Sequence, residues 1–327
     1  MSAARGQWLS SEAPPAAIEI AAHRVSVVGI GKGPDGPVVQ GWASEALPGG
    51  AVVPSLTALN VIDPAAVADA LRRAMQRAGV KAKRAGLVIP DLAAKVSLVP
   101  FETVPERSED LAELINWQVR KAAPFRVEDA QVAFVPGAPH GDRGRTYVVT
   151  LARTDVVRQY EDVCAAAGAQ AGIVDLASFN VINAVLAGRA RPERDWLLVN
   201  TTRESQTLAI MRGDTLMFFR NRPVEGDETL PDLVHQTAMY YEDRLQGAGF
   251  ERVVLAGGAA WSGDDVRRSL AERLNAPVAS IEPRQVAAFS GRAFDDLQPA
   301  AADALLAPLG LLLRDSAGAA AGGGAAR

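Results

Sequence analysis

The sequence predicts an α/β protein of two related lobes, the first of which is interrupted by an inserted β-α-β-β-α subdomain. Three observations lead to this prediction. The chain has 327 residues, of which 48% are hydrophobic and 22% are charged, and this is enough for two or three domains with their own cores. Short β-type runs alternate with amphipathic helices, as in layered α/β folds. The start of the second half, LLVNTTRESQTLAIM, repeats the strand, polar turn and strand of AIEIAAHRVSVVGI.

The first lobe is expected over residues 16–89 and 169–190. Turn residues separate its β-type runs, and the predicted strands are residues 17–20, 25–30, 38–42, 87–89 and 171–176. Asp63 followed by Pro64 is a typical helix start, and apolar residues recur at helical spacing until Gly79. A second helix is predicted around residues 178–186.

Residues 90–168 are expected to form the insert. Its predicted elements are a strand at 95–101, a helix at 108–122, strands at 131–135 and 147–151, and a helix at 154–167. In the first helix Leu111, Ile115 and Val119 share one face, and Pro124 stops it.

The second lobe is expected over residues 191–300, after a polar break rich in arginine. Its predicted strands are residues 196–199, 207–211, 216–220 and 252–255, with a helix from Leu230 to Leu245. A C-terminal helix is predicted at residues 301–315. Residues 1–15 and 316–327 are Ser/Ala/Pro-rich and Ala/Gly-rich, so we expect both ends to be disordered.

Composition excludes several classes of function. The 34 basic and 38 acidic residues give a net charge of −4, and no basic block indicates nucleic-acid binding. The single cysteine, Cys164, excludes a disulfide framework, and the three histidines are too scattered for a Cys/His metal site. No signal peptide is apparent, and the longest apolar run, residues 304–313, is far shorter than the ~20 residues of a membrane span. Direct membrane insertion is therefore not expected, and any membrane association must come through a partner.

Three stretches of the sequence carry a resemblance to a known family. The first is VIPDLAAKVSLVPFETVP with LAELINWQVRKAAPFRVEDAQVAF after it, the second is YVVTLARTDVVRQYEDVCAAAGAQAGIVDLASFNVINAV, and the third is VVLAGGAA. Together they resemble the PilM family of type IV pilus assembly proteins, in the branch of the actin-like ATPase superfamily that includes FtsA. The resemblance covers residues 16–315. It implies an actin-like, ribonuclease H-like fold whose insert is an SHS2 subdomain.

The resemblance also implies a nucleotide cleft between the lobes, built from the two strand-turn-strand corners and a Gly-Gly turn. The corresponding positions are Glu19, Ala21, Asn200, Thr202, Gly257 and Gly258. Glu19 is the candidate for handling Mg²⁺, so ATP and Mg²⁺ are the cofactors that the family would suggest. The two glycines either contact adenine or simply form a strand-to-helix turn.

The corners depart from the family pattern. The first has Glu19 and Ala21 where the family has an aspartate and a glycine, and alanine in a left-handed or close-approach position costs about 1–2 kcal/mol. The second has Asn200 and Thr202 where the family has an aspartate and a glycine. Glu204 would bring a carboxylate toward bound phosphates, at a cost of about 4 kcal/mol for charges about 4 Å apart at an effective dielectric near 20. These changes predict a degenerate nucleotide site.

Three other charged residues have two interpretations each. Arg24 and Arg203 either pair with phosphate or are solvated turn residues. Asp175, the one candidate for a catalytic role, either orients a water in the cleft or serves as a helix-capping or inter-lobe hydrogen-bonding residue. No other catalytic residue is predicted.

The resemblance further implies a partner. The PilM family captures the N-terminal tail of a PilN-like inner-membrane protein between the insert and the first lobe. Trp117 and Phe125 either flank such a peptide groove or form the core of the insert. Self-association, as in filament-forming relatives, is also possible.

The leading interpretation is therefore a cytoplasmic PilM-like adaptor that is peripheral to the inner membrane through its partner and is not an enzyme. One alternative is an ATP/Mg²⁺-binding switch with slow or no hydrolysis. Another is the cytoplasmic part of a GspL-like secretion platform. A sugar kinase ranks last, because its chemistry requires intact phosphate-binding turns.

Overall fold

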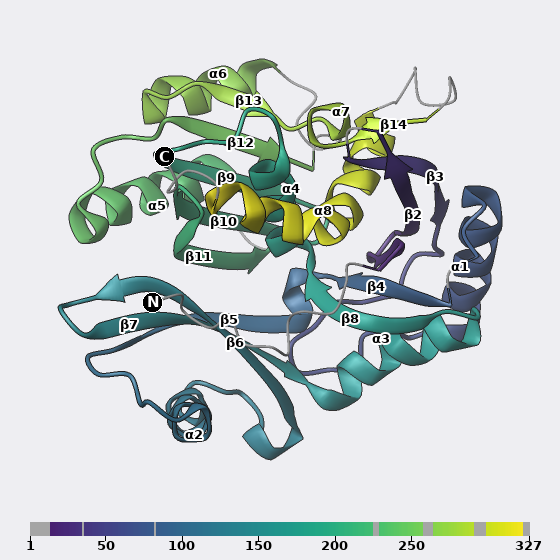
Figure 1. The fold of residues 1–327 in the computed structure, drawn as a ribbon, viewed down its shortest axis with the longest axis horizontal. Coiled ribbons are helices and arrows are strands. Elements are labelled where there is room, and N and C mark those ends of the chain that lie inside the picture. The colour runs from purple at the N-terminus through teal and green to yellow at the C-terminus, as the bar shows by residue number, and fades with distance from the viewer. Residues whose placement is uncertain are drawn as a thin grey trace.

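The computed structural model describes six stretches of the chain, residues 14–34, 36–81, 83–224, 229–257, 264–290 and 299–322. The first lobe is built on a mixed sheet whose strands are β1 (Ala16–Ile20), β2 (Arg24–Gly33), β3 (Gly36–Ala46), β4 (Arg84–Ile89), β8 (Gln170–Leu176) and β14 (Ala288–Phe289). Their order across the sheet is β14-β3-β2-β1-β4-β8 (Figure 1). All five residues of β1 are buried, because helices cover both faces of this sheet.

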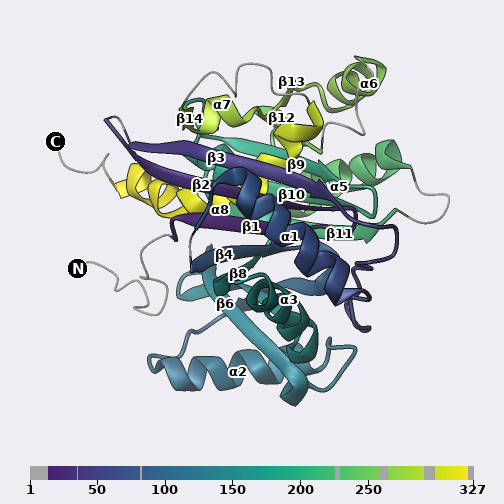
Figure 2. The ribbon, with the colours of Figure 1, turned by 90° about the vertical axis from the view of Figure 1, so that its right-hand side faces the viewer.

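Helices α1 (Pro64–Ala78) and α3 (Thr154–Ala166) pack on one face of the first sheet (Figure 2). The start of α1 is as predicted, since the carboxylate of Asp63 accepts a hydrogen bond from the amide of Ala66 at 3.0 Å. Its end is also as predicted, because Gly79 takes the left-handed conformation with φ 66°.

Helices α4 (Ala177–Ala187) and α8 (Pro299–Gly322) occupy the space between the two lobes. Their apolar side chains form one core with Val28 and Val88 from the first sheet and with Trp196 and Leu198 from the second. Burial of this surface holds the two lobes together.

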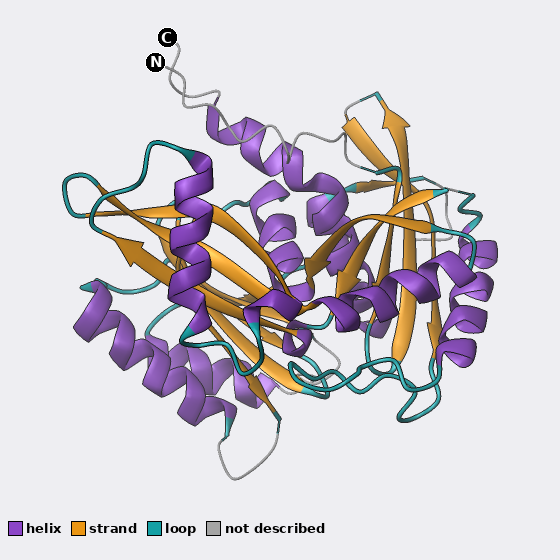
Figure 3. Ribbon diagram, turned by 90° about the horizontal axis from the view of Figure 1, so that it is seen from below, coloured by secondary structure: helices purple, strands orange, loops and turns teal. Residues whose placement is uncertain are grey.

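The second lobe has strands β9 (Asp195–Thr201), β10 (Ser205–Arg212), β11 (Thr215–Pro223), β12 (Arg252–Ala256) and β13 (Val278–Ser280). Their order, β11-β10-β9-β12-β13, matches β3-β2-β1-β4-β8 of the first lobe, so the predicted two-lobed α/β fold is confirmed. Helices α5 (Leu230–Leu245) and α6 (Asp264–Leu274) cover its outer face (Figure 1). Figure 3 shows the chain coloured by secondary structure, with helices packed against the sheets. Thr229 and Asp232 form a capping box at the start of α5.

The insert is a three-stranded antiparallel sheet with one helix. Its elements are β5 (Ala94–Phe101), α2 (Ser108–Arg120), β6 (Ala130–His140) and β7 (Gly144–Arg153), with short 3₁₀ turns η2 (Asp91–Ala93) and η3 (Val127–Asp129). The strand order is β5-β7-β6. Leu111, Ile115 and Val119 of α2 are buried against this sheet, as their spacing predicted.

The structure differs from the expected boundaries in three places. Helix α3, expected in the insert, packs in the core of the first lobe through Val156 and Tyr160. Residues 283–289, expected in the second lobe, form the short helix α7 (Pro283–Val286) and strand β14, which pairs with β3 of the first lobe. Helix α8 continues through residues 316–322, expected to be disordered, because alanine propagates a helix that packing has already nucleated.

Candidate functional site

A cavity of about 530 Å³ lies between the two lobes. Its walls come from the β1–β2 corner, the β9–β10 corner, the end of β12 and one side of α8. The residues that line it include Glu19, Arg24, Asn200, Thr202, Gly257 and Asp303. The structure thus brings four of the predicted cleft residues around one space. Ala21 lines an adjoining cavity of about 40 Å³, and Gly258 lies outside the described residues.

The β1–β2 corner closes without a strained backbone. The amide of Ala21 donates to the carbonyl of Arg24 at 2.9 Å, and none of residues 21–24 has a positive φ. The expected cost of about 1–2 kcal/mol for an alanine in a left-handed position is therefore wrong for this corner, since the corner does not use that conformation.

Four side chains connect the two corners beside the cavity, and we call them the cross-cleft relay: Glu19, His23, Arg24 and Glu204. Glu19 accepts a hydrogen bond from Arg24 at 3.0 Å, and Nη1 of Arg24 lies 2.8 Å from Nε2 of His23. The other ring nitrogen of His23, Nδ1, lies 3.6 Å from the carboxylate of Glu204. An arginine N–H can only donate, so Nε2 of His23 accepts and the ring proton is assigned to Nδ1, facing Glu204.

The cross-cleft relay influences the protonation of Glu204. Burial raises the pKa of Glu204, but the approach of the Nδ1 proton of His23 and the hydroxyl of Thr202 outweigh this effect and hold the pKa below its usual range. Arg24 is paired with Glu19 and also approaches the carbonyl of Asp303 at 3.5 Å, whereas Arg203 is exposed. The charged side chains of Glu19, Arg24 and Glu204 thus each contact another side chain of this protein.

The β9–β10 corner is organised by the side chain of Thr202. Its hydroxyl oxygen accepts hydrogen bonds from the amides of Glu204 at 3.2 Å and Ser205 at 3.0 Å. The amide of Thr202 in turn donates to the carbonyl of Ser205 at 2.8 Å. The turn itself therefore satisfies the amides of Glu204 and Ser205, through the hydroxyl of Thr202. A glycine at position 202 has no hydroxyl and would leave both amides free.

Gly257 has a packing role at the end of β12. Its φ is 83°, and a Cβ at this position would lie 1.7 Å from the carbonyl oxygen of Thr201. Only glycine fits so close to the neighbouring strand β9. This contact explains why position 257 is a glycine and agrees with the turn interpretation, while contact with adenine stays a prediction.

Asp175 lies at the end of β8, and its carboxylate accepts a hydrogen bond from the amide of Leu176 at 2.8 Å. Burial raises its pKa to about 6, against the opposing effects of Leu176, Arg314 and Asn180. This bond joins Asp175 to the residue directly after it and does not cap α4, which has no side-chain cap hydrogen bond at its N-cap residue, so both interpretations of Asp175 stay predictions.

A buried carboxylate that sequence reasoning missed lies close by. Asp91, only 5% exposed, accepts hydrogen bonds from the amide and the hydroxyl of Ser178 and from the hydroxyl of Thr207. Ser178 also accepts from Asn200 at 2.9 Å, and Thr207 accepts from Asn221 at 3.1 Å. We call these five side chains the Asp91 network. The only signal in the sequence is one acidic residue between two strongly apolar strands.

The two predicted partner residues differ in their surroundings. Trp117 is 55% exposed on α2, with the amino group of Lys121 4.1 Å from its ring centroid. Phe125 packs partly against the core of the insert. In Figures 1 and 2 the strands of the insert lie between α2 and the lobes. The exposure of Trp117 contradicts its placement in the core of the insert, whereas a peptide groove flanked by these residues stays a prediction.

A loop at the junction of the first lobe and the insert exposes apolar side chains. Between β3 and α1, Val53, Leu59 and Ile62 are 49%, 50% and 59% exposed. The loop is held by Asn60, which is fully buried and bonded to Ser55, Ala58, Gln159 and Tyr160. We call residues 51–62 the junction loop. The backbone that carries these exposed apolar side chains is therefore held in place by hydrogen bonds.

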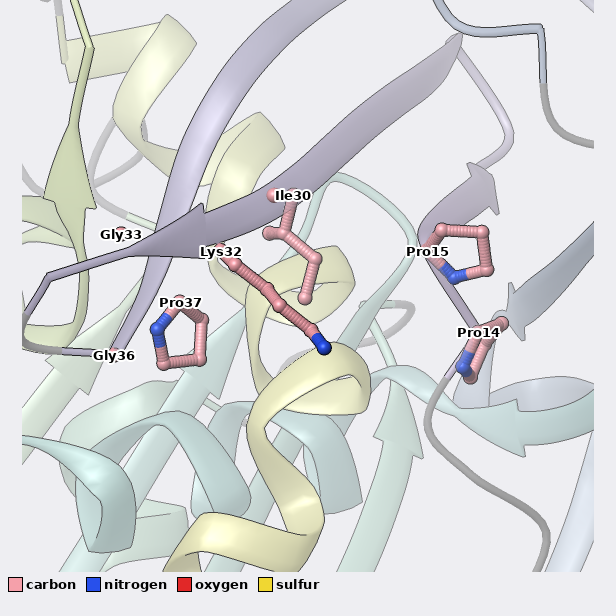
Figure 4. Close-up of a pocket in the computed structure, with 8 residues that line it drawn as sticks. Pro14, Pro15, Ile30, Lys32, Gly33, Gly36 and Pro37 are labelled. Atoms are coloured by element: carbon pink, nitrogen blue, oxygen red, sulfur yellow. The ribbon is translucent and has the colours of Figure 1, made fainter.

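A further cavity of about 400 Å³ lies at the far end of the β2–β3 hairpin. Figure 4 shows its lining of Ile30, Lys32, Pro37, Pro14 and Pro15. None of the predicted site residues belongs to it.

Within the described residues, no cluster of His, Cys, Asp and Glu is suited to a metal ion. Over the same part of the chain, no helix has the length and apolar character needed to span a membrane.

A solved structure agrees with the predicted fold, and two others have weaker similarity to this chain. A chain of the PilM-PilN type IV pilus biogenesis complex superposes with a TM-score of 0.78 at 19% identity, covering 93% of this chain and 99% of that one. A Bacteroides thetaiotaomicron protein with an actin-like ATPase fold and unknown function gives 0.47 at 11% identity, covering 85% and 94%. The cytoplasmic domain of EpsL, an inner-membrane component of the Vibrio cholerae type II secretion system, gives 0.45 at 14%, covering 92% and 93%. No curated protein matches the sequence.

The family itself is identified by sequence. The sequence model described as type IV pilus assembly protein PilM matches residues 17–244, which is more than half of the chain. With the actin-like two-lobed fold and its insert, this match assigns the protein: the chain belongs to the PilM family of type IV pilus assembly proteins.

Proposed function

We propose that this chain is a cytoplasmic adaptor of the type IV pilus assembly machinery that binds the tail of a PilN-like membrane protein and works without nucleotide turnover. Membership of the PilM family supports the role in pilus assembly. The absence of nucleotide turnover is proposed from one observation: the hydroxyl of Thr202 accepts hydrogen bonds from two backbone amides of the β9–β10 corner.

The residues present do not fit a bound triphosphate with Mg²⁺. A phosphate needs free amides that converge on it, and two of those in the second corner already donate to Thr202. The carboxylate of Glu204 would face the phosphates, and Arg24 is engaged with Glu19 and His23. The chain therefore supplies its own side chains where the family would place the phosphates.

Titration calorimetry with ATP and Mg²⁺ tests this part of the proposal. The wild-type chain is expected to give no saturable heat up to about 1 mM ATP, which corresponds to a binding free energy weaker than about 4 kcal/mol. Saturable binding at micromolar ATP would refute it and favour the nucleotide-dependent switch. The double variant Thr202→Gly, Glu204→Gln is the matched control, because it frees the amides and removes the charge.

The junction loop is the surface that we propose for the tail. It lies beside the start of α3, where the side chain of Arg153 bonds the carbonyl of Thr57 and the chain returns from the insert to the first lobe. Three exposed aliphatic side chains on an anchored backbone suit an extended apolar peptide, because the loop itself needs no reordering when the peptide binds.

Fluorescence anisotropy with a labelled synthetic peptide of the PilN-like protein's cytoplasmic tail tests the docking surface. The double variant Leu59→Ser, Ile62→Ser should weaken binding at least about tenfold, as expected for the loss of two anchors worth about 1 kcal/mol each. Met239→Ser, which alters a comparably exposed apolar residue on α5, serves as the control and should leave the affinity unchanged. Equal affinities for all three proteins would reject this surface.

A further inference from the structure

The Asp91 network stands where three parts of the molecule meet. Asp91 belongs to η2, the first turn after β4 and the root of the insert. Ser178 is in the first turn of α4, the helix between the lobes, and Thr207 is in β10 of the second lobe. One carboxylate thus receives hydrogen bonds from both the interlobe helix and the second sheet.

On the side of α4, Asp91 acts as a helix cap supplied from a distant segment. The residue in the N-cap position of α4 is Leu176, which has no side-chain acceptor. Asp91 accepts the free amide of Ser178 at 2.9 Å and so takes over that role. The positive end of the α4 dipole helps to hold the charge, although burial raises the pKa of Asp91.

On the side of the second lobe, the network reaches the wall of the interlobe cavity. The hydroxyl of Thr207 donates to Asp91 at 2.8 Å. Asn200, which lines the cavity, donates to Ser178 at 2.9 Å. The cavity wall and the root of the insert are therefore two hydrogen bonds apart, through side chains that are all buried.

We propose that the Asp91 network is the mechanical joint between the interlobe cavity and the insert, so that rotation of the second lobe changes the position of the insert. Losing one of these hydrogen bonds would take a partner away from a buried polar group, and this cost favours the observed arrangement of the two lobes and the insert. The insert borders the junction loop, so a change in its position would affect binding of the tail. This consequence rests on the proposed function. Thermodynamic linkage requires the coupling to be reciprocal: the free energy by which a change in the cavity alters partner binding equals that by which the bound partner alters the change in the cavity.

Distances between pairs of spin labels report the position of the insert relative to each lobe, and they can be measured without any partner or nucleotide. One label on Trp117→Cys in the insert is paired with a label on Met239→Cys in the second lobe or on Arg72→Cys in the first, all at exposed positions. Cys164 is buried, and burial raises the pKa of its thiol to about 12, so it escapes labelling. The variant is Thr207→Val, which keeps the shape of the side chain and removes its hydrogen bond to Asp91.

In Thr207→Val, the distance distribution between the insert and the second lobe should widen at least twofold, and that between the insert and the first lobe should stay unchanged. Thr207→Ser, which retains a hydroxyl, should restore the narrow distribution. Thr237→Val is the matched control, because that buried hydroxyl bonds only within α5, to the carbonyl of Leu233. Identical distributions in Thr207→Val and wild type would overturn the proposal.

A double-mutant cycle tests the coupling itself. Glu204→Gln breaks the cross-cleft relay, and it should shift the distance between the insert and the second lobe when Thr207 is present. The shift should be lost in the Thr207→Val background. An equal shift in both backgrounds would mean that the cavity acts on the insert by another route, against the proposal. Because no peptide or ATP is used, failure here is separate from failure of the adaptor function.

Discussion

Substitution of Gly310 by alanine would place a methyl group in the contact between α8 and α4. A Cβ on Gly310 would lie 1.6 Å from the carbonyl oxygen of Asn180, whereas ordinary van der Waals contact begins at 3.4 Å. The two helices would have to separate by roughly 1.8 Å, and neighbouring contacts of the shared core would loosen. Overpacking costs about 1–3 kcal/mol, and more for a backbone clash, while the helix propensity of alanine returns only about 1 kcal/mol.

The net loss for Gly310→Ala is therefore about 2 kcal/mol or more, which lowers the melting temperature by about 3 °C or more for a protein of 327 residues, because the entropy of unfolding grows with chain length. Differential scanning calorimetry measures it. The matched control is Gly49→Ala, because Gly49 has no heavy atom within 4 Å of its Cβ position and no positive φ. A Gly310→Ala protein that melts within about 1 °C of wild type would refute the packing argument, as would an equal loss in the control.

Three further predictions concern the site and the surface. Gly257→Ala should destabilise the end of β12 by more than Gly310→Ala destabilises α8, because it combines a Cβ 1.7 Å from Thr201 with a positive φ; thermal unfolding of the two variants compares them, and the reverse order would contradict it. Burial raises the pKa of Asp175 to about 6, so its contribution to stability falls as the pH rises from about 4 to about 6 and stays low above that range. Asp175→Asn should therefore raise the melting temperature relative to wild type more at pH 7.5 than at pH 4, and equal differences at the two values would be evidence against burial as the cause. Trp117→Ala should change the free energy of unfolding by no more than about 0.5 kcal/mol in denaturant titration, since the side chain is exposed, and a larger loss would mean that Trp117 packs against the fold.

Local signals predicted the elements well because their causes are local. Asp63, Pro64 and Gly79 bracket α1 through capping contacts within a few residues. Periodicity identified the apolar face of α3, but it could not tell which surface the face meets. Val156 and Tyr160 would look the same packed against the insert or against the first lobe. Assignment of α3 to the insert failed for that reason.

The sequence predicted which residues line the candidate site better than it predicted the hydrogen bonds that these residues make. Glu19, Asn200 and Thr202 do line one cavity, because the duplicated corners meet between the lobes. The use of the Thr202 hydroxyl as an acceptor within its own turn depends on backbone geometry that residue types do not specify. Asp91 was missed because its partners are 87 and 116 residues away along the chain.

Helix α8 has a consequence for biosynthesis. Leu309 and Leu311 complete the core that covers Val28 and Val88 of the first sheet, yet they follow those strands by more than two hundred residues. At typical rates of translation, this face of the sheet stays bare for on the order of ten seconds or more while the remainder of the polypeptide emerges. A nascent chain of this protein is therefore a natural client for ribosome-associated chaperones, and release before α8 is made would leave the interlobe core open to aggregation.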